Sequence, residues 1–170
     1  LVDLNDDNTL EIVSATHGDR PEFFVRNYLG YFLPTWPKST FENSWTFNTP
    51  TVWQQAEHTT ILMGQPNGVE ASDMLYAWSE TGALQAGFPI FKEGGVEGII
   101  SLADLDGDNV AEMLFGTNLF DQTTGTSFIH AYRMDGSGEL TEFPLRPRGW
   151  TFMNGASLGD VDGDGRLDIV

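Results

Sequence analysis

The sequence contains no cysteine, few basic residues and no long apolar run. Without cysteine the chain has no disulfide, no reactive thiol and no Cys-based zinc site. Only 8 Lys and Arg oppose 25 Asp and Glu, and the formal net charge is −17. Because phosphate binding needs a basic face, neither nucleic acid nor an anionic membrane surface is expected as a partner. Membrane insertion is not expected either, since no run of about 18 apolar residues is present.

The acidic residues that are present lie in three clusters. Twelve of the 25 fall within residues 3–11, 104–112 and 160–168. Carboxylates at such close spacing repel one another unless a cation lies between them. Part of the negative charge is therefore interpreted as metal-binding charge.

These clusters belong to a segment that occurs three times without gaps, at residues 1–13, 102–114 and 158–170. The first interval is about twice the second, which predicts a further repeat near residue 53. Residues 61–64 match the strand that follows each cluster, whereas residues 54–58 have lost most of the acids. We therefore expect a repeat there that binds no metal.

A second element follows each of these segments: a strand, a Gly-centred turn, another strand and an aromatic-Pro pair. It is clearest at residues 74–89 and 129–144 and weaker at residues 24–37. No helical period stands out, and a strand-only unit of about 50–56 residues suits a four-stranded propeller blade. We predict an all-β fold of antiparallel β-propeller blades with calcium-binding loops.

The approximate repeats are residues 1–50, 51–100 and 101–157, with the start of another at 158–170. Propellers usually close with about 4–8 blades, so we expect this chain to be part of one larger propeller.

The loop at residues 160–168 shows the metal pattern most fully, with acids at its positions 1, 3, 5 and 9. Oxygen donors in this number suit Ca²⁺, which takes about 6–8 of them. Position 7 would contribute its main-chain carbonyl, and position 6 needs a residue that tolerates a sharp turn. The predicted ligands of up to three Ca²⁺ sites are Asp3, Asn5, Asp7, Thr9 and Glu11, then Asp104, Asp106, Asp108, Val110 and Glu112, and finally Asp160, Asp162, Asp164, Arg166 and Asp168.

An EF-hand is excluded by two features of these loops. An EF-hand carries a bidentate Glu at position 12, where this chain has Ser14 or Phe115. An EF-hand also continues into a helix, whereas residues 11–13 and 112–114 read as strands. The acid at position 9 is therefore predicted to close the site.

The loops resemble the FG-GAP/VCBS repeats of bacterial secreted proteins, which are related to the integrin α-subunit propeller. The family pattern D-x-[DN]-x-D-[GN]-x-x-[DE] fits residues 102–114 and 158–170, and fits residues 1–13 with Asn5 at position 3. Residues 53–61 depart from it. The resemblance implies a β-propeller with Ca²⁺ in its blade loops, and it does not imply one function.

Other groups form no recognisable catalytic site. His17, His58 and His130 are expected in structural or surface roles, and the acids outside the loops form no obvious pair. Of the tryptophans, Trp36 and Trp78 recur with the repeat and are predicted in the core. For Trp45, Trp53 and Trp150, which lie near loops, both core packing and sugar stacking stay open.

We therefore expect a non-enzymatic, extracellular or cell-surface module, secreted by a bacterium, that recognises a protein or glycan. Weak extracellular sites bind Ca²⁺ at about 10⁻⁴–10⁻³ M and would stay empty in the cytosol, which supports that location. Two alternatives stay open. One is an accessory propeller of a secreted polysaccharide-degrading or proteolytic enzyme, and the other is a structural spacer.

Overall fold

The computed structural model describes residues 1–16, 22–39, 49–56, 58–65, 72–96, 98–119, 126–149, 151 and 155–170. Within these residues the fold is all-β and contains no helix, as predicted. It follows that none of the described segments is a helix long and apolar enough to cross a membrane.

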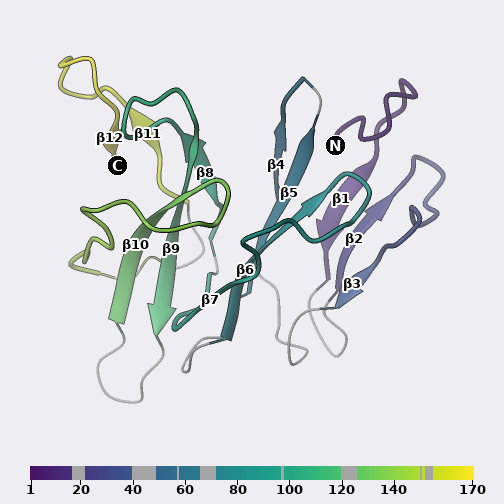
Figure 1. The fold of residues 1–170 in the computed structure, drawn as a ribbon, viewed down its shortest axis with the longest axis horizontal. Helices are drawn as coiled ribbons and strands as arrows, with labels where there is room; N and C mark the ends of the chain where they lie inside the picture. Colours follow the sequence, from purple (N-terminus) through teal and green to yellow (C-terminus); the bar gives the residue numbers. More distant parts are fainter. Residues whose placement is uncertain are drawn as a thin grey trace.

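The strands form four antiparallel sheets that follow one another along the chain (Figure 1). The first contains β1 (Ile12–Ala15), β2 (Glu22–Arg26) and β3 (Lys38–Ser39). The second contains β4 (Thr51–Gln54), β5 (Thr59–Gly64), β6 (Ser72–Ser79) and β7 (Ile90–Lys92). The third contains β8 (Ser101–Ala103), β9 (Glu112–Leu119) and β10 (Thr126–Arg133), and the fourth contains β11 (Leu158–Gly159) and β12 (Asp168–Ile169).

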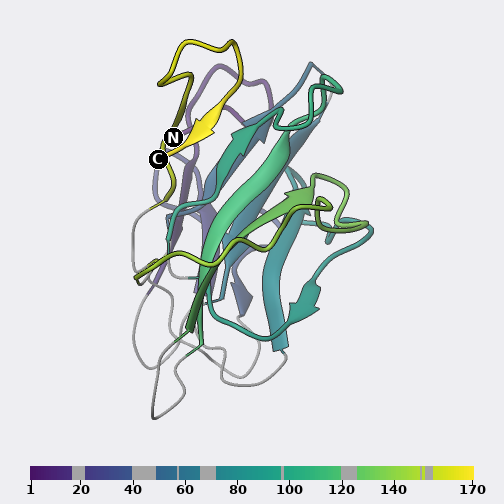
Figure 2. The ribbon, with the colours of Figure 1, turned by 90° about the vertical axis from the view of Figure 1, so that its left-hand side faces the viewer.

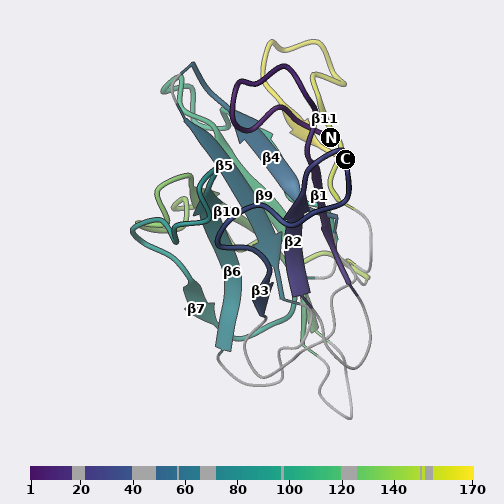
Figure 3. The ribbon, with the colours of Figure 1, turned by 90° about the vertical axis from the view of Figure 1, so that its right-hand side faces the viewer.

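The sheets lie face to face, like neighbouring blades of a propeller. Figure 1 shows them side by side, and the two side views show them one behind another (Figures 2 and 3). In all three views the acidic loops at the N-terminus, between β8 and β9 and between β11 and β12 lie at the same end of the sheets. The repeat therefore places all three predicted metal loops along one edge of the molecule.

Successive side chains along the strands of the second sheet point to opposite faces, and this divides the core into two layers. Ile61 and Met63 of β5 pack in a cluster with the first sheet, whereas Leu62 packs in a cluster with the third. Both faces of a central blade are buried, so β5 is buried at every position and is a continuous apolar run after Thr59 and Thr60. Trp36 and Trp78, predicted in the core, are 7% and 4% exposed.

The contacts between neighbouring sheets also repeat. The hydroxyl of Thr51, at the start of β4, donates to the carbonyl of Ile100 over 2.7 Å. Ser101, at the same place in the third sheet, donates to the carbonyl of Ala156 over 2.7 Å. The predicted aromatic-Pro pairs are cis peptides in all three repeats: Trp36-Pro37, Phe88-Pro89 and Phe143-Pro144.

Among the described residues, only the second sheet has the four strands predicted for each blade. In the first sheet the innermost strand is reduced to one bridge between Val2 and Glu11. In the third, the outermost strand is reduced to a bridge between Ile129 and Leu145. The predicted repeat boundaries remain a prediction.

Candidate metal-binding loops

The three acidic loops share one hydrogen-bond pattern, with loop positions counted from Asp3, Asp104 and Asp160. The main-chain N–H at position 2 donates to the acid at position 9 over 2.8 Å in every loop. The N–H at position 6 donates to the acid at position 1 over 2.9 Å, and the N–H at position 7 donates to the acid at position 5 over 2.8 Å. The carboxylates at positions 1, 5 and 9 thus hold the loop in a curl around them.

Two positions of each loop have left-handed backbone. At position 6 the φ angles are 64° for Asn8, 68° for Asn109 and 84° for Gly165. This confirms the sharp turn expected there, because Asn and Gly tolerate that region best. Position 4 was not predicted to be special, yet Asp6, Gly107 and Gly163 have φ of 57°, 82° and 80°. Glycine at two of these three residues was the feature of the sequence that could have predicted left-handed backbone at position 4.

The acid at position 9 is the most buried part of each site. Glu11 and Glu112 are buried, and Oε1 of Glu11 is buried without a hydrogen-bond partner. Burial, followed by the charges of Asp106, Asp108 and Asp104, raises the pKa of Glu112, opposed by the hydrogen bond from the N–H of Leu105. A cation in the second loop would relieve the charge repulsion on Glu112. A cation in the first loop would be coordinated by the unpaired oxygen of Glu11.

The structure brings several of the predicted ligands within reach of one ion. Carboxylate oxygens of Asp104, Asp106 and Asp108 lie within 4.8 Å of one another. The same holds for Asp160, Asp162 and Asp168 in the last loop, a group that does not include Asp164. These donors are hard oxygens without imidazole or thiolate, so the residues fit an oxygen-preferring divalent cation.

In the first loop the side chains at positions 3 and 5 contact each other. The amide nitrogen of Asn5 donates to Asp7 over 3.1 Å, and the N–H of Asp7 is 3.1 Å from the amide oxygen of Asn5. Hydrogen bonds from Thr9 lower the pKa of Asp7. The main-chain carbonyls of Thr9, Val110 and Arg166 remain predicted ligands.

The second sheet lacks a comparable loop. Four residues separate β4 from β5, whereas eight separate β8 from β9. The short hairpin is closed by the N–H of Gln55, which donates to the carbonyl of His58 over 2.8 Å. That residues 54–58 hold no metal stays a prediction, and Glu57 lies outside the described residues.

Sequence reasoning missed a basic side chain beside the second loop. Arg133, at the end of β10, places Nη1 3.7 Å from Asp106 and 3.9 Å from Asp108. Its partners lie about 25 residues away in the chain, and no motif joins them. Neither the first nor the third loop has a described basic side chain paired with its acids in this way.

Sequence reasoning also missed a buried polar network between the second and third sheets. His130 is 2% exposed, and its Nδ1 lies 2.6 Å from Glu139, which also binds Lys92 over 2.9 Å. Burial lowers the pKa of His130, and the hydrogen bond to Glu139 opposes that shift. His130 therefore lies buried within a hydrogen-bonded network, and its structural role stays a prediction.

Several residues considered in the sequence lie outside the described part of the chain. They are His17, Glu42, Trp45, Glu70, Glu97, Asp121 and Trp150.

Comparison with known proteins bears on the last two loops and the sheet between them. The family model of the FG-GAP-like repeat matches residues 104–170. No curated protein and no solved structure matches the chain. The match begins at the first acid of the second loop and includes the whole of the third. Residues 104–170 therefore match an FG-GAP-like repeat, and the described residues of the chain have the all-β, blade-like fold expected of such repeats.

Proposed function

We propose that this protein is a non-enzymatic, extracellular Ca²⁺-binding β-propeller module that recognises a protein or glycan. FG-GAP repeats occur in extracellular and surface proteins, often bind Ca²⁺ and are in general non-catalytic. The proposal gives the acids of the loops a role as ligands, which leaves them unavailable as catalytic acids or bases.

The observation that carries the proposal is the common geometry of the three loops. Three hydrogen bonds recur at 2.8 Å, 2.9 Å and 2.8 Å although position 7 carries a different residue in each loop. Acidic turns that bind no ion would not need to share one backbone conformation. A curl that turns carboxylates toward a common centre is what Ca²⁺ coordination requires.

The role we propose for Ca²⁺ is structural. At about 1 mM Ca²⁺, sites with a Kd of about 10⁻⁴–10⁻³ M stabilise the folded state by roughly 0.4–1.4 kcal/mol each. Since a domain is stable by only about 5–15 kcal/mol, three such sites matter. The micromolar Ca²⁺ of a cytosol would leave them empty, and this supports secretion.

Thermal unfolding in Ca²⁺, Mg²⁺ and EDTA tests the proposal. One site is worth about 0.4–1.4 kcal/mol, so Ca²⁺ should raise Tm by about 1–6 °C per loop. Mg²⁺ should do much less, because it demands a rigid octahedron and keeps its waters. The triple variant Asp104→Ala, Asp106→Ala and Asp108→Ala should lose part of the gain.

The control is Glu142→Ala, which removes an exposed acid outside the loops. It should keep the whole calcium response. If EDTA leaves Tm unchanged in the unmodified protein, the loops are solvated turns, and the argument for an extracellular location falls with them.

A further inference from the structure

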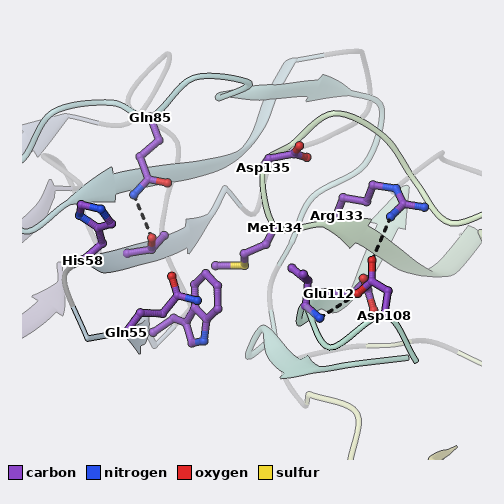
Figure 4. Close-up of a pocket in the computed structure, with 11 residues that line it drawn as sticks. Gln55, His58, Gln85, Asp108, Glu112, Arg133, Met134 and Asp135 are labelled. Atoms are coloured by element: carbon purple, nitrogen blue, oxygen red, sulfur yellow. Dashed lines mark hydrogen bonds and ion pairs between the residues drawn. The ribbon is translucent and has the colours of Figure 1, made fainter. Parts of the chain in front are cut away.

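A cavity of about 520 Å³ lies between the second and third sheets, beside the second acidic loop. Figure 4 shows Gln55 and His58 on one side of it, Arg133 and Asp108 on the other, and Met134 between them. Its size falls within the range of about 300–1,000 Å³ that is usual for small-molecule sites.

The cavity exists because one blade has lost its metal loop. The hairpin between β4 and β5 is four residues shorter than the connection between β8 and β9. In the shortened hairpin, Gln55 and His58 line a recess that faces the intact loop of the third sheet. The shorter hairpin therefore leaves a space beside the longer loop of the next sheet.

The floor of the cavity is apolar and partly aromatic. Trp53 is half-buried: it packs against the core cluster between the two sheets and also lines the cavity. Met134 is buried beside it, and Val110 lies at the loop side. The arrangement provides an aromatic surface and aliphatic walls, against which the C–H face of a ring could stack.

The rim carries planar hydrogen-bonding groups. Gln85 is held in place by its amide nitrogen, which donates to Oγ1 of Thr60 over 2.9 Å. The side chains of Gln55 and His58 are exposed, and in the described part of the chain no hydrogen bond engages either of them. Amide and imidazole groups both donate and accept, so together they suit a ligand with several hydroxyls.

The carboxylates and the guanidinium at the cavity come from the third sheet and its loops. Asp108 accepts the N–H of Val110 over 2.8 Å and lies beside Arg133. Glu112 accepts the N–H of Leu105, and Asp135 accepts the N–H of Ser137. Asp108 and Glu112 are also predicted to bind Ca²⁺. Gln55 and Gln85, which line the cavity from the second sheet, are uncharged, and that side suits a neutral ligand.

We propose that this cavity binds a neutral saccharide ring, which stacks on Trp53 and hydrogen-bonds to Gln55, His58 and Gln85. The inference deepens the recognition role proposed above by naming a ligand class and a place, and it rests on that role.

Ligand-observed saturation-transfer NMR of the whole chain in millimolar Ca²⁺ tests this site. The probes are the methyl glycosides of glucose, mannose, galactose and N-acetylglucosamine, with N-acetyl-lysine methylamide as the cationic comparison. Trp53→Leu keeps an apolar side chain toward the core and removes the stacking surface. It should weaken binding on the order of tenfold. The pair Gln55→Ala and His58→Ala changes only exposed side chains and should also weaken binding.

Tyr31→Ala is the matched control, because Tyr31 is an exposed aromatic residue outside the cavity. Binding that survives the cavity variants, or that falls only in Tyr31→Ala, overturns the site. Binding of the lysine probe without any glycoside overturns the ligand class. If no glycoside binds while Ca²⁺ still raises Tm, the inference fails and the calcium module stands. If glycosides bind while EDTA leaves Tm unchanged, the site stands and the calcium proposal fails.

Discussion

Replacing Gly87 by Ala should destabilise the contact between the second and third sheets. Gly87 has φ of +84°, and a Cβ added there would overlap the carbonyl oxygen of Asp135. That oxygen is main chain in the turn after β10, so it cannot move aside as a flexible side chain would. Gly136 in the same turn is also close, since its own added Cβ would meet the carbonyl oxygen of Gly87 at 2.7 Å.

Gly30→Ala is the matched variant. Gly30 lies in the turn after β2, has φ of +85°, and has nothing within 4 Å of an added Cβ. It should incur only the left-handed backbone cost of about 1–2 kcal/mol, which lowers Tm by about 3–6 °C. Gly87→Ala adds a steric cost of about 1–3 kcal/mol and should lower Tm further, by about 3–9 °C.

The assay is thermal unfolding by circular dichroism at fixed Ca²⁺ concentration. Equal losses for the two variants would refute the reasoning, because backbone strain alone would then account for both. The sheets would not meet at Gly87 and Asp135 as the structure has them.

Three further predictions concern the network, the core and the second loop. Burial lowers the pKa of His130, so below about pH 6.5 the unfolded chain binds a proton that the folded chain resists. Stability measured by urea unfolding should therefore fall as pH drops below about 6.5, and His130→Gln should flatten that slope. Met113 is 0% exposed, and Met113→Ala should lower the free energy of unfolding by about 2–5 kcal/mol; a loss below about 1 kcal/mol would contradict its place in the core. Arg133→Ser removes the cation beside Asp106 and Asp108, so calorimetric titration should show tighter Ca²⁺ binding at that loop, by about fivefold for a Coulomb energy of about 1 kcal/mol. Weaker binding in this variant would mean that Arg133 orders the loop rather than competing with the ion.

The features predicted from sequence are those set by short-range chemistry. The strand after each loop, the Gly turn at Gly82 and the aromatic-Pro pair at Phe88-Pro89 depend on residues that lie close together in the chain. The repeat then extended each local pattern to three places. The left-handed backbone at position 6 was predicted for the same reason, because Asn109 and Gly165 tolerate it.

The features that were not predicted depend on contacts between blades. Arg133 meets Asp106 only because β10 ends beside the loop that precedes β9. The network of His130, Glu139 and Lys92 joins two sheets. The reduction of the outermost strand of the third sheet to a bridge at Leu145 also depends on packing rather than on strand propensity.

The cavity beside Trp53 illustrates the same limit. The sequence showed that residues 54–58 had lost their acids, but a space is defined by what lies opposite it. Only the fold places that hairpin against Asp108 and Arg133. Trp53 packs against the core, as one of its two predicted roles requires, and it also lines the cavity; its other predicted role, sugar stacking, stays a prediction.

The stoichiometry of bound calcium tests the central claim most directly. The protein would be dialysed against millimolar CaCl₂ in the presence of excess MgCl₂, and bound calcium would be counted per chain by elemental analysis against an EDTA-treated sample. The account predicts three Ca²⁺ per chain, one for each loop with the shared hydrogen-bond pattern. It predicts two in the variant that carries Asp104→Ala, Asp106→Ala and Asp108→Ala. No bound calcium in the unmodified chain, or the same number in both proteins, would contradict it.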